Sequence, residues 1–224
     1  MGSMNFEQAR FNMVEQQIRT WDVLDQDVLD SLYAVPRENF VPGPYKALAF
    51  TDMEIPIGAS SGSVERMMTP KMEARIVQEV AVRKSDRVLE VGTGSGYLTA
   101  LLAHRAAHVT SIEINSPIAE FGRLNLERRN VRNIMLEKGD AARGWRAGAP
   151  YDVIVLTGST PVLPATLLKQ LAAGGRLFAV SGNAPVMVAK LVTCNAPGSF
   201  SEAELFDTVI APLTNAERPS RFEF

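Results

Sequence analysis

The sequence is poor in cysteine and histidine. Its 224 residues include one cysteine, Cys194, and two histidines, His104 and His108. A single cysteine excludes an intrachain disulfide and a multi-cysteine zinc site, and the apolar run around Cys194 is typical of a small core or edge residue. We therefore expect no metal, and a protein of a reducing compartment, the cytoplasm.

A long apolar run and a strong charge of either sign are also missing. No segment approaches the roughly 20 apolar residues of a membrane span, and the opening MGSMNF lacks the charged and then apolar order of a secretion signal. A net charge of −2 gives no basic footprint for nucleic acid. We expect neither a membrane nor a nucleic acid as partner, and we interpret residues 1–3 as an expression scar.

The N-terminal third contains two kinds of sequence, one with helical spacing of apolar residues and one rich in loop-forming residues. Apolar residues three and four apart predict helices at residues 5–20 and 25–34, the second with Asp25 as its N-cap. Residues 41–70 are rich in proline, glycine and serine, and a loop of this length is usually functional or mobile. Thr69 followed by Pro70 predicts the N-cap and first residue of another helix.

Strands and helices alternate from residue 71 onward. We predict strands at residues 87–91, 108–114, 134–138, 151–156 and 176–180, and helices at residues 97–105, 117–128 and 164–171. This order is typical of βαβ units, and it predicts an α/β fold with a doubly wound, mostly parallel sheet. Two further strand-like runs, residues 187–194 and 205–211, have no helix between them, so we expect them to pair antiparallel at the sheet edge.

A glycine loop follows the first core strand, in the stretch LEVGTGSGY. Gly92, Gly94 and Gly96, with Thr93 and Ser95 between them, would let the backbone approach a ligand at the start of the next helix. The loop departs from the dinucleotide fingerprint G-x-G-x-x-G/A, whose last position is occupied by the large Tyr97. A nicotinamide-dependent oxidoreductase is therefore disfavoured.

Three carboxylates accompany this loop at the ends of strands. Glu113 lies 21 residues after Gly92, where an acid can accept hydrogen bonds from ribose hydroxyls, and Asp140 follows the third strand, where it can face an adenine edge. Glu90 precedes the loop and suits a cationic group better than a pyrophosphate. A nucleoside that carries an ammonium and a sulfonium is S-adenosyl-L-methionine (SAM), so we predict a class I SAM-dependent methyltransferase core at residues 71–224.

The chain resembles the protein-L-isoaspartate O-methyltransferase family from about residue 11 to residue 214. The pieces that carry the likeness are MVEQQIRT, VPRENFVP, DMEIPIG, LEVGTGSGYLTALLA, the segment YDVIVLTGSTPVLPATLLKQLAAGGRL, and VIAPLT. The resemblance implies transfer of a methyl group from SAM to the free carboxylate of isoaspartyl residues in damaged proteins. It also implies that residues 4–70 hold the N-terminal helices and the loop that covers substrate and cofactor.

The resemblance extends the list of candidate site residues. It adds Ala141, Thr157 and Thr214 to the cofactor residues named above. The acceptor segment departs from the family pattern, because Met68 stands where the family has a serine and Arg66 where it has a threonine. Thr69 can supply a hydroxyl there, and Ser60, Ser61 and Ser63 are candidates only if the insertion rearranges the loop.

Two alternatives share the SAM site. One is a relative that methylates a different acceptor, because the acceptor segment has diverged, and the other is a SAM-binding protein without catalysis. A carboxylate is already a nucleophile at neutral pH, so the chemistry asks mainly for in-line positioning and desolvation. The absence of an obvious general base is therefore uninformative, and we expect no catalytic role for His104 or His108. The oligomeric state is left open.

Overall fold

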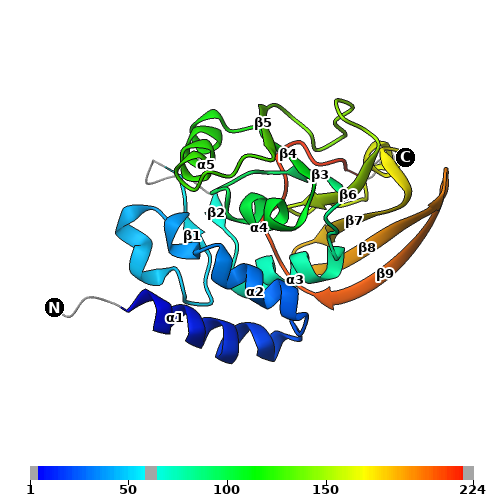
Figure 1. Ribbon diagram of the computed structural model, residues 1–224. Coiled ribbons are helices and arrows are strands. Elements are labelled where there is room, and N and C mark those ends of the chain that lie inside the picture. Colours follow the sequence, from blue (N-terminus) through cyan, green and yellow to red (C-terminus); the bar gives the residue numbers. More distant parts are fainter. Residues whose placement is uncertain (1–4, 59–64, 219–224) are drawn as a thin grey trace.

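The computed structural model describes residues 5–58 and 65–218 (Figure 1). Residues 1–3, interpreted above as an expression scar, and the candidate serines Ser60, Ser61 and Ser63 lie outside these ranges. No helix among the described residues is both long and apolar enough to cross a bilayer.

A seven-stranded mixed sheet forms the centre of the molecule, with strand order β5-β4-β3-β6-β7-β8-β9. The first five strands of that order are parallel, and β8 and β9 extend the sheet antiparallel. The strands are β3 (Arg87–Val91), β4 (His108–Glu113), β5 (Ile134–Lys138), β6 (Tyr151–Leu156), β7 (Leu171–Asn183), β8 (Val186–Ala196) and β9 (Ser199–Asp207). The predicted doubly wound sheet with antiparallel edge strands is confirmed.

Each face of the sheet has its own apolar core. Along β6, Val153 and Val155 pack into a large core shared with the N-terminal helices, whereas Ile154 and Leu156 pack into a smaller core on the opposite face. A strand that is buried on both faces has a continuous run of apolar residues, and this run is why the sequence predicts β6.

The helices cover mainly the face with the larger core. They are α3 (Pro70–Val80), α4 (Tyr97–Arg105) and α5 (Ser116–Arg128), with the N-terminal helix α2 (Gln26–Ala34) packed against α3 and α4 (Figure 1). The Thr69 hydroxyl accepts the Met72 N–H, so Thr69 is the N-cap of α3 as predicted. Asp25 caps α2 in the same way.

Two predicted boundaries near the C-terminus are wrong. The helix expected at residues 164–171 is only α6 (Ala165–Leu168), because Leu171 already pairs with Tyr151 and begins β7. The last strand is β9 rather than residues 205–211. It turns back early at Gly198, whose φ of +81° suits glycine, and residues beyond Asp207 leave the sheet.

The first predicted helix is helical throughout but not uniform. It begins as α1 (Phe6–Met13), capped by Asn5, continues through a π turn at Val14–Ile18 and ends in a 3-10 turn at Arg19–Trp21. Asp22 then reverses the chain in the left-handed region, at a φ of +58°.

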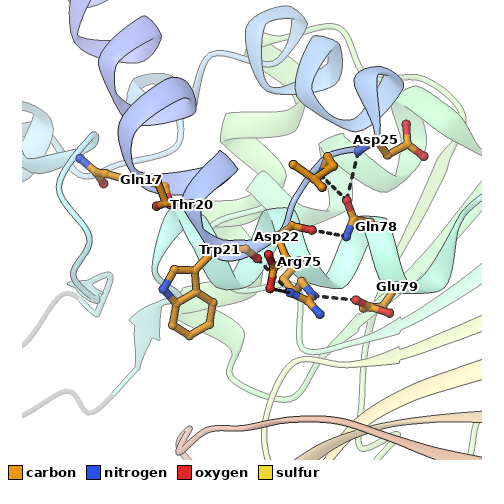
Figure 2. A network of polar contacts seen from close by, with 9 residues as sticks. Gln17, Thr20, Trp21, Asp22, Asp25, Arg75, Gln78 and Glu79 are labelled. Carbon is orange, nitrogen blue, oxygen red and sulfur yellow. Dashed lines mark hydrogen bonds and ion pairs between the residues drawn. The ribbon is translucent and has the colours of Figure 1, made fainter.

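Side chains of α3 hold this reversal in place (Figure 2). Arg75 donates to the Trp21 carbonyl at 2.9 Å, and Gln78 donates to the Asp22 carbonyl at 2.8 Å. The Gln78 side-chain oxygen also accepts the backbone N–H groups of Leu24 and Asp25. The N-terminal helices are therefore docked on the core by backbone groups that find side-chain partners on α3.

Both edge strands of the sheet carry charged side chains. In β5 the exposed residues include Glu137 and Lys138, and in β9 they include Glu202 and Glu204. Lys190 on β8 pairs with both glutamates of β9.

Candidate functional site

The main pocket lies at the carboxyl ends of β3, β4, β5 and β6, where open α/β sheets place their ligands. One wall, called here the sheet side, is formed by residues 91, 92, 94, 112–114, 139–142 and 157–158. The other wall, the loop side, is formed by the segments 54–57, 65–68 and 210–214. All of residues 210–214 line the pocket, and the other two segments contribute Glu54, Ile57, Glu65, Arg66 and Met68.

The glycine loop requires glycine because of its backbone conformation and, at two positions, because a side chain would collide with a neighbour. Gly92, Gly94 and Gly96 have φ values of +101°, +55° and +83°, which side-chain-bearing residues rarely adopt. A Cβ atom on Gly92 would lie 2.1 Å from the Thr157 hydroxyl, and one on Gly96 would collide with Leu126. Gly94 meets only the tip of Ile57, so its position is set by conformation rather than by crowding.

Glu113 ties the loop to the next strand. Its carboxylate accepts the Gly94 N–H at 3.0 Å through one oxygen and the Asn115 N–H at 3.0 Å through the other. Glu113 is 8% exposed and lines the pocket, so lone pairs that face the pocket can still accept from hydroxyl donors of a ligand.

Asp140 lines the same pocket beyond β5. It accepts the Ala142 N–H at 3.0 Å and the Asn215 side-chain amide at 2.9 Å. The side chain thus joins the end of β5 to the C-terminal segment. Both carboxylates predicted to face the nucleoside are brought to one wall.

Glu90 lies below the glycine loop and is fully buried. One of its oxygens accepts the hydroxyls of Thr99 and Ser111, while the other has no hydrogen-bond partner among the described residues. Burial raises the pKa of Glu90 to about 8, against the opposing effect of the hydrogen bonds from Ser111 and Thr99. Glu90 lines a smaller cavity beside the main pocket, together with Thr93 and Ser95.

The smaller cavity and the main pocket share part of their lining. The residues common to both are Arg66, Met68, Gly92, Gly94 and Thr157. The two spaces therefore adjoin at these residues. Glu113 and Asp140 line only the main pocket, and the shared residues mark the end near the glycine loop and Glu90.

Arg37 holds the loop side from within. It is fully buried and forms an ion pair with Glu73 of α3. Its remaining donors reach the carbonyls of Ala49 at 2.9 Å and of Met68 at 2.6 Å, and its guanidinium lies 5.2 Å from the centre of the Tyr97 ring. One side chain from VPRENF thus fixes the backbone of the acceptor segment relative to α3 and to the first residue of α4.

A second groove opens beside the loop side of the pocket. It is lined by Trp21, Glu54, Met68, Thr69, Lys71, Met72 and residues 207–210. Glu54, Met68 and Ile210 line both spaces, so the groove meets the main pocket at Met68. Lys71 pairs with Asp52 at 2.6 Å and lies 4.0 Å from the centre of the Trp21 ring, which fixes one wall of the groove.

The structure brings most of the predicted residues together, but not all. Gly92, Gly94, Glu113, Asp140, Ala141, Thr157, Thr214 and Met68 line the main pocket. Glu90, Thr93 and Ser95 line only the smaller cavity, Thr69 lines only the groove, and Gly96 lines none of these three spaces but caps α4. His104 lies in other surface depressions, away from the pocket.

Sequence reasoning missed several lining residues. Ile57, Ile112, Ile118 and residues 210–213 are mostly apolar, and an apolar side chain gives no chemical signal of a site. The fragments PIG and VIAPLT held the only signal for two of these segments. Glu65 was missed because no motif includes it. It accepts the Asn115 amide at 2.6 Å and so joins the loop side to the sheet side.

Comparison with known proteins gives a consistent result. The sequence profile of the family described as protein-L-isoaspartate(D-aspartate) O-methyltransferase matches residues 8–218. A protein-L-isoaspartate O-methyltransferase from Gloeobacter violaceus is 36% identical over 207 residues, which are 92% of this chain and 98% of that protein. One from Methanoculleus marisnigri is 42% identical over 173 residues, 77% of each chain.

A solved structure shares the fold. It is a crystal structure of a Plasmodium falciparum protein described as the same methyltransferase, in complex with S-adenosyl-L-homocysteine. It superposes with a TM-score of 0.77 at 20% sequence identity, and the match covers 95% of this chain and 99% of that one. The architecture is thus that of a class I methyltransferase.

Proposed function

The chain belongs to the protein-L-isoaspartate O-methyltransferase family, and from this premise we propose that it transfers the methyl group of SAM to the free carboxylate of isoaspartyl residues in proteins. The observation that carries this proposal is the family match over residues 8–218, because that range includes both the pocket and the groove that joins it.

The residues at the pocket fit SAM as a ligand. The crowding at Gly92 and its positive φ produce a backbone cradle that no side chain could occupy, and Glu113 and Asp140 supply acceptors for hydroxyl and amine donors on the same wall. The unpartnered buried oxygen of Glu90 suits a nearby cationic group. We assign the nucleoside to the part of the pocket lined by Glu113, Asp140 and Ala141, with Thr214 beside it and Thr157 toward the glycine loop.

Bound SAM supplies a methyl group that is already activated by its positively charged sulfur. The chain's own residues then have three tasks: to orient the acceptor, to exclude water and to hold the reacting groups in line. We assign these tasks to the junction of pocket and groove, where Met68 and Ile210 give an apolar boundary. In this proposal no side chain takes a proton, because the acceptor is an ionised carboxylate.

The division of the chain follows from this assignment. Residues 71–224 bind the cofactor, and residues 4–70 carry the helices and the segment that close the acceptor side. The hydroxyl of Thr69 is already used to cap α3, so its contribution to the acceptor would come through the groove it lines. The proposed location is the cytoplasm, consistent with one buried free cysteine, Cys194, and the proposed partner is a protein that contains isoaspartyl residues, not a membrane or nucleic acid.

The test is transfer of labelled methyl groups from SAM to a peptide that contains isoaspartate, with the same peptide containing aspartate as the control. We expect base-labile methyl esters on the isoaspartyl peptide only. Tight binding of SAM with no transfer to that peptide would reject the proposal and leave a different acceptor or a non-catalytic role.

A matched pair of variants tests the acceptor position. Met68→Ser restores a hydroxyl at the junction, whereas Met53→Ser changes an exposed methionine that lines none of the three spaces. We expect Met68→Ser to change the KM for the isoaspartyl peptide and Met53→Ser to leave it unchanged. Equal kinetics in both variants would show that Met68 does not limit acceptor binding.

A further inference from the structure

The charged residues of the pocket are unequally distributed. Of the described residues that line it, four carry a carboxylate: Glu54, Glu65, Glu113 and Asp140. Among the same lining residues only Arg66 carries a positive charge. A ligand that brings its own carboxylate into this pocket therefore meets one cationic partner there.

Arg66 stands at the end of the pocket where a carboxylate is expected. It begins the short strand β2 (Arg66–Met67), which pairs with β1 (Ile55–Pro56) on the loop side. It belongs to the small set of residues that line both the pocket and the smaller cavity, together with Gly92, Gly94 and Thr157. Glu113 and Asp140 line the main pocket but not the smaller cavity.

The guanidinium of Arg66 is free to bind a ligand. The side chain is exposed and makes no hydrogen bond or ion pair with any residue in 5–58 or 65–218. Arg37, by contrast, is fully buried and its donors are taken up by Glu73 and two carbonyls. Arg37 is therefore a structural arginine, whereas the guanidinium of Arg66 is available to a ligand. Both lie close to Met68.

We propose that Arg66 is the carboxylate-binding residue of this pocket. A guanidinium matches the two oxygens of a carboxylate with parallel hydrogen bonds, whereas a carboxylate without such a partner would be repelled by Glu54. The proposal rests on the proposed function, in which two carboxylates enter: the α-carboxylate of the cofactor's methionine part and the carboxylate of the acceptor. The chemistry is the same for both sources.

Calorimetry with two adenosine compounds distinguishes the sources. S-adenosyl-L-homocysteine carries the α-carboxylate, and 5′-methylthioadenosine lacks it. If Arg66 binds the cofactor, R66A should weaken S-adenosyl-L-homocysteine about tenfold or more and leave 5′-methylthioadenosine within twofold. R66K, which keeps the charge but loses the paired donors, should fall between. R128A is the control, because Arg128 is exposed on α5 and lines none of the cavities described.

Kinetics test the second source. If Arg66 binds the acceptor, R66A should bind both adenosine compounds like the wild type, but raise the KM for the isoaspartyl peptide about tenfold with a smaller change in kcat. A variant that matches R128A in both assays overturns the proposal. If the wild type does not methylate the peptide, the proposed function fails, and the binding of S-adenosyl-L-homocysteine alone decides the role of Arg66.

Discussion

The sheet side and the loop side of the pocket are built by different means. On the sheet side, parallel strands set the backbone by regular hydrogen bonds, and β3 pairs with β4 from Arg87 to Val91 and with β6 from Val88 to Val91. On the loop side only two residue pairs link β1 to β2, and the segment is held by individual side chains such as Arg37 and Glu65.

This difference shows where each wall can change. A sheet-side residue such as Gly92 is constrained by backbone geometry, whereas a loop-side residue such as Met68 is anchored through its carbonyl and packs its half-buried side chain against the larger core. We therefore expect the sheet side to tolerate fewer substitutions than the loop side. Arg66 and Met68, which the sequence comparison predicts to stand in place of family hydroxyls, lie on the loop side.

The largest expected effect is on the sheet side. Gly92→Val should abolish measurable binding of S-adenosyl-L-homocysteine, because a Cβ there meets Thr157 at 2.1 Å and the φ of +101° is strained for valine. The control is Gly43→Val, at a glycine with no atom within 4 Å of the added Cβ. Calorimetry that found similar affinities for both variants would show that the cradle tolerates a side chain.

Arg37→Met tests the loop side, and its effect should appear in stability. Glu73 is 2% exposed and would be left without its ion-pair partner, which typically costs about 3–5 kcal/mol in the free energy of unfolding. Urea denaturation measures this. The double variant Arg37→Met, Glu73→Leu should recover a substantial part of the loss, because no unpaired charge remains buried. Equal losses in the single and double variants would assign the effect to the carbonyls of Ala49 and Met68 instead.

Glu113→Ala should have a smaller effect, confined to the cofactor. Removing the carboxylate frees the N–H groups of Gly94 and Asn115 and deletes the proposed ribose acceptor, so we expect about tenfold weaker binding of S-adenosyl-L-homocysteine. Glu113→Gln keeps an acceptor for one of the two N–H groups and should lose less. Unchanged affinity in the alanine variant would remove Glu113 from the cofactor site.

A further effect is a change in how the free energy of unfolding depends on pH. Because burial raises the pKa of Glu90 from its ordinary value of 4.5 to about 8, the folded protein keeps a proton that the unfolded chain releases between these values. Stability should therefore fall as pH rises from about 4.5 to about 8. Glu90→Gln should reduce this fall, and the exposed Glu137→Gln should not. Parallel stability curves for wild type and Glu90→Gln would show that Glu90 has the same proton affinity in both states.

The two walls also differ in how far the sequence predicts them. On the sheet side, β3, β5, β6 and α4 were predicted to the residue, because a strand buried on both faces and a glycine turn have direct local signatures. The end of β9 was not predicted. Val209 and Ile210 look like strand residues, but Ile210 packs at the pocket and Ser159 bonds to its carbonyl, which is a tertiary contact.

The loop side had family motifs but no periodicity. The motif VPRENF identified the segment around Arg37. The sequence did not predict that this arginine is fully buried, nor that it donates to the carbonyl of Met68, 31 residues away. The same limit applies to Arg66. Its identity was visible in the sequence, but its position as the one cation among four carboxylates of the described lining depends on four separate segments meeting at one pocket.

The charges on the two outermost strands have a consequence for the behaviour of the protein at high concentration. Each edge of the sheet offers unpaired backbone N–H and C=O groups to a strand of another molecule. A second copy that docked along β9 would bring its charges against Glu202 and Glu204, and one that docked along β5 would meet Glu137 and Lys138. These side chains disfavour edge-to-edge pairing of sheets from two molecules. The long hairpin of β8 and β9 can therefore remain at the surface without promoting aggregation.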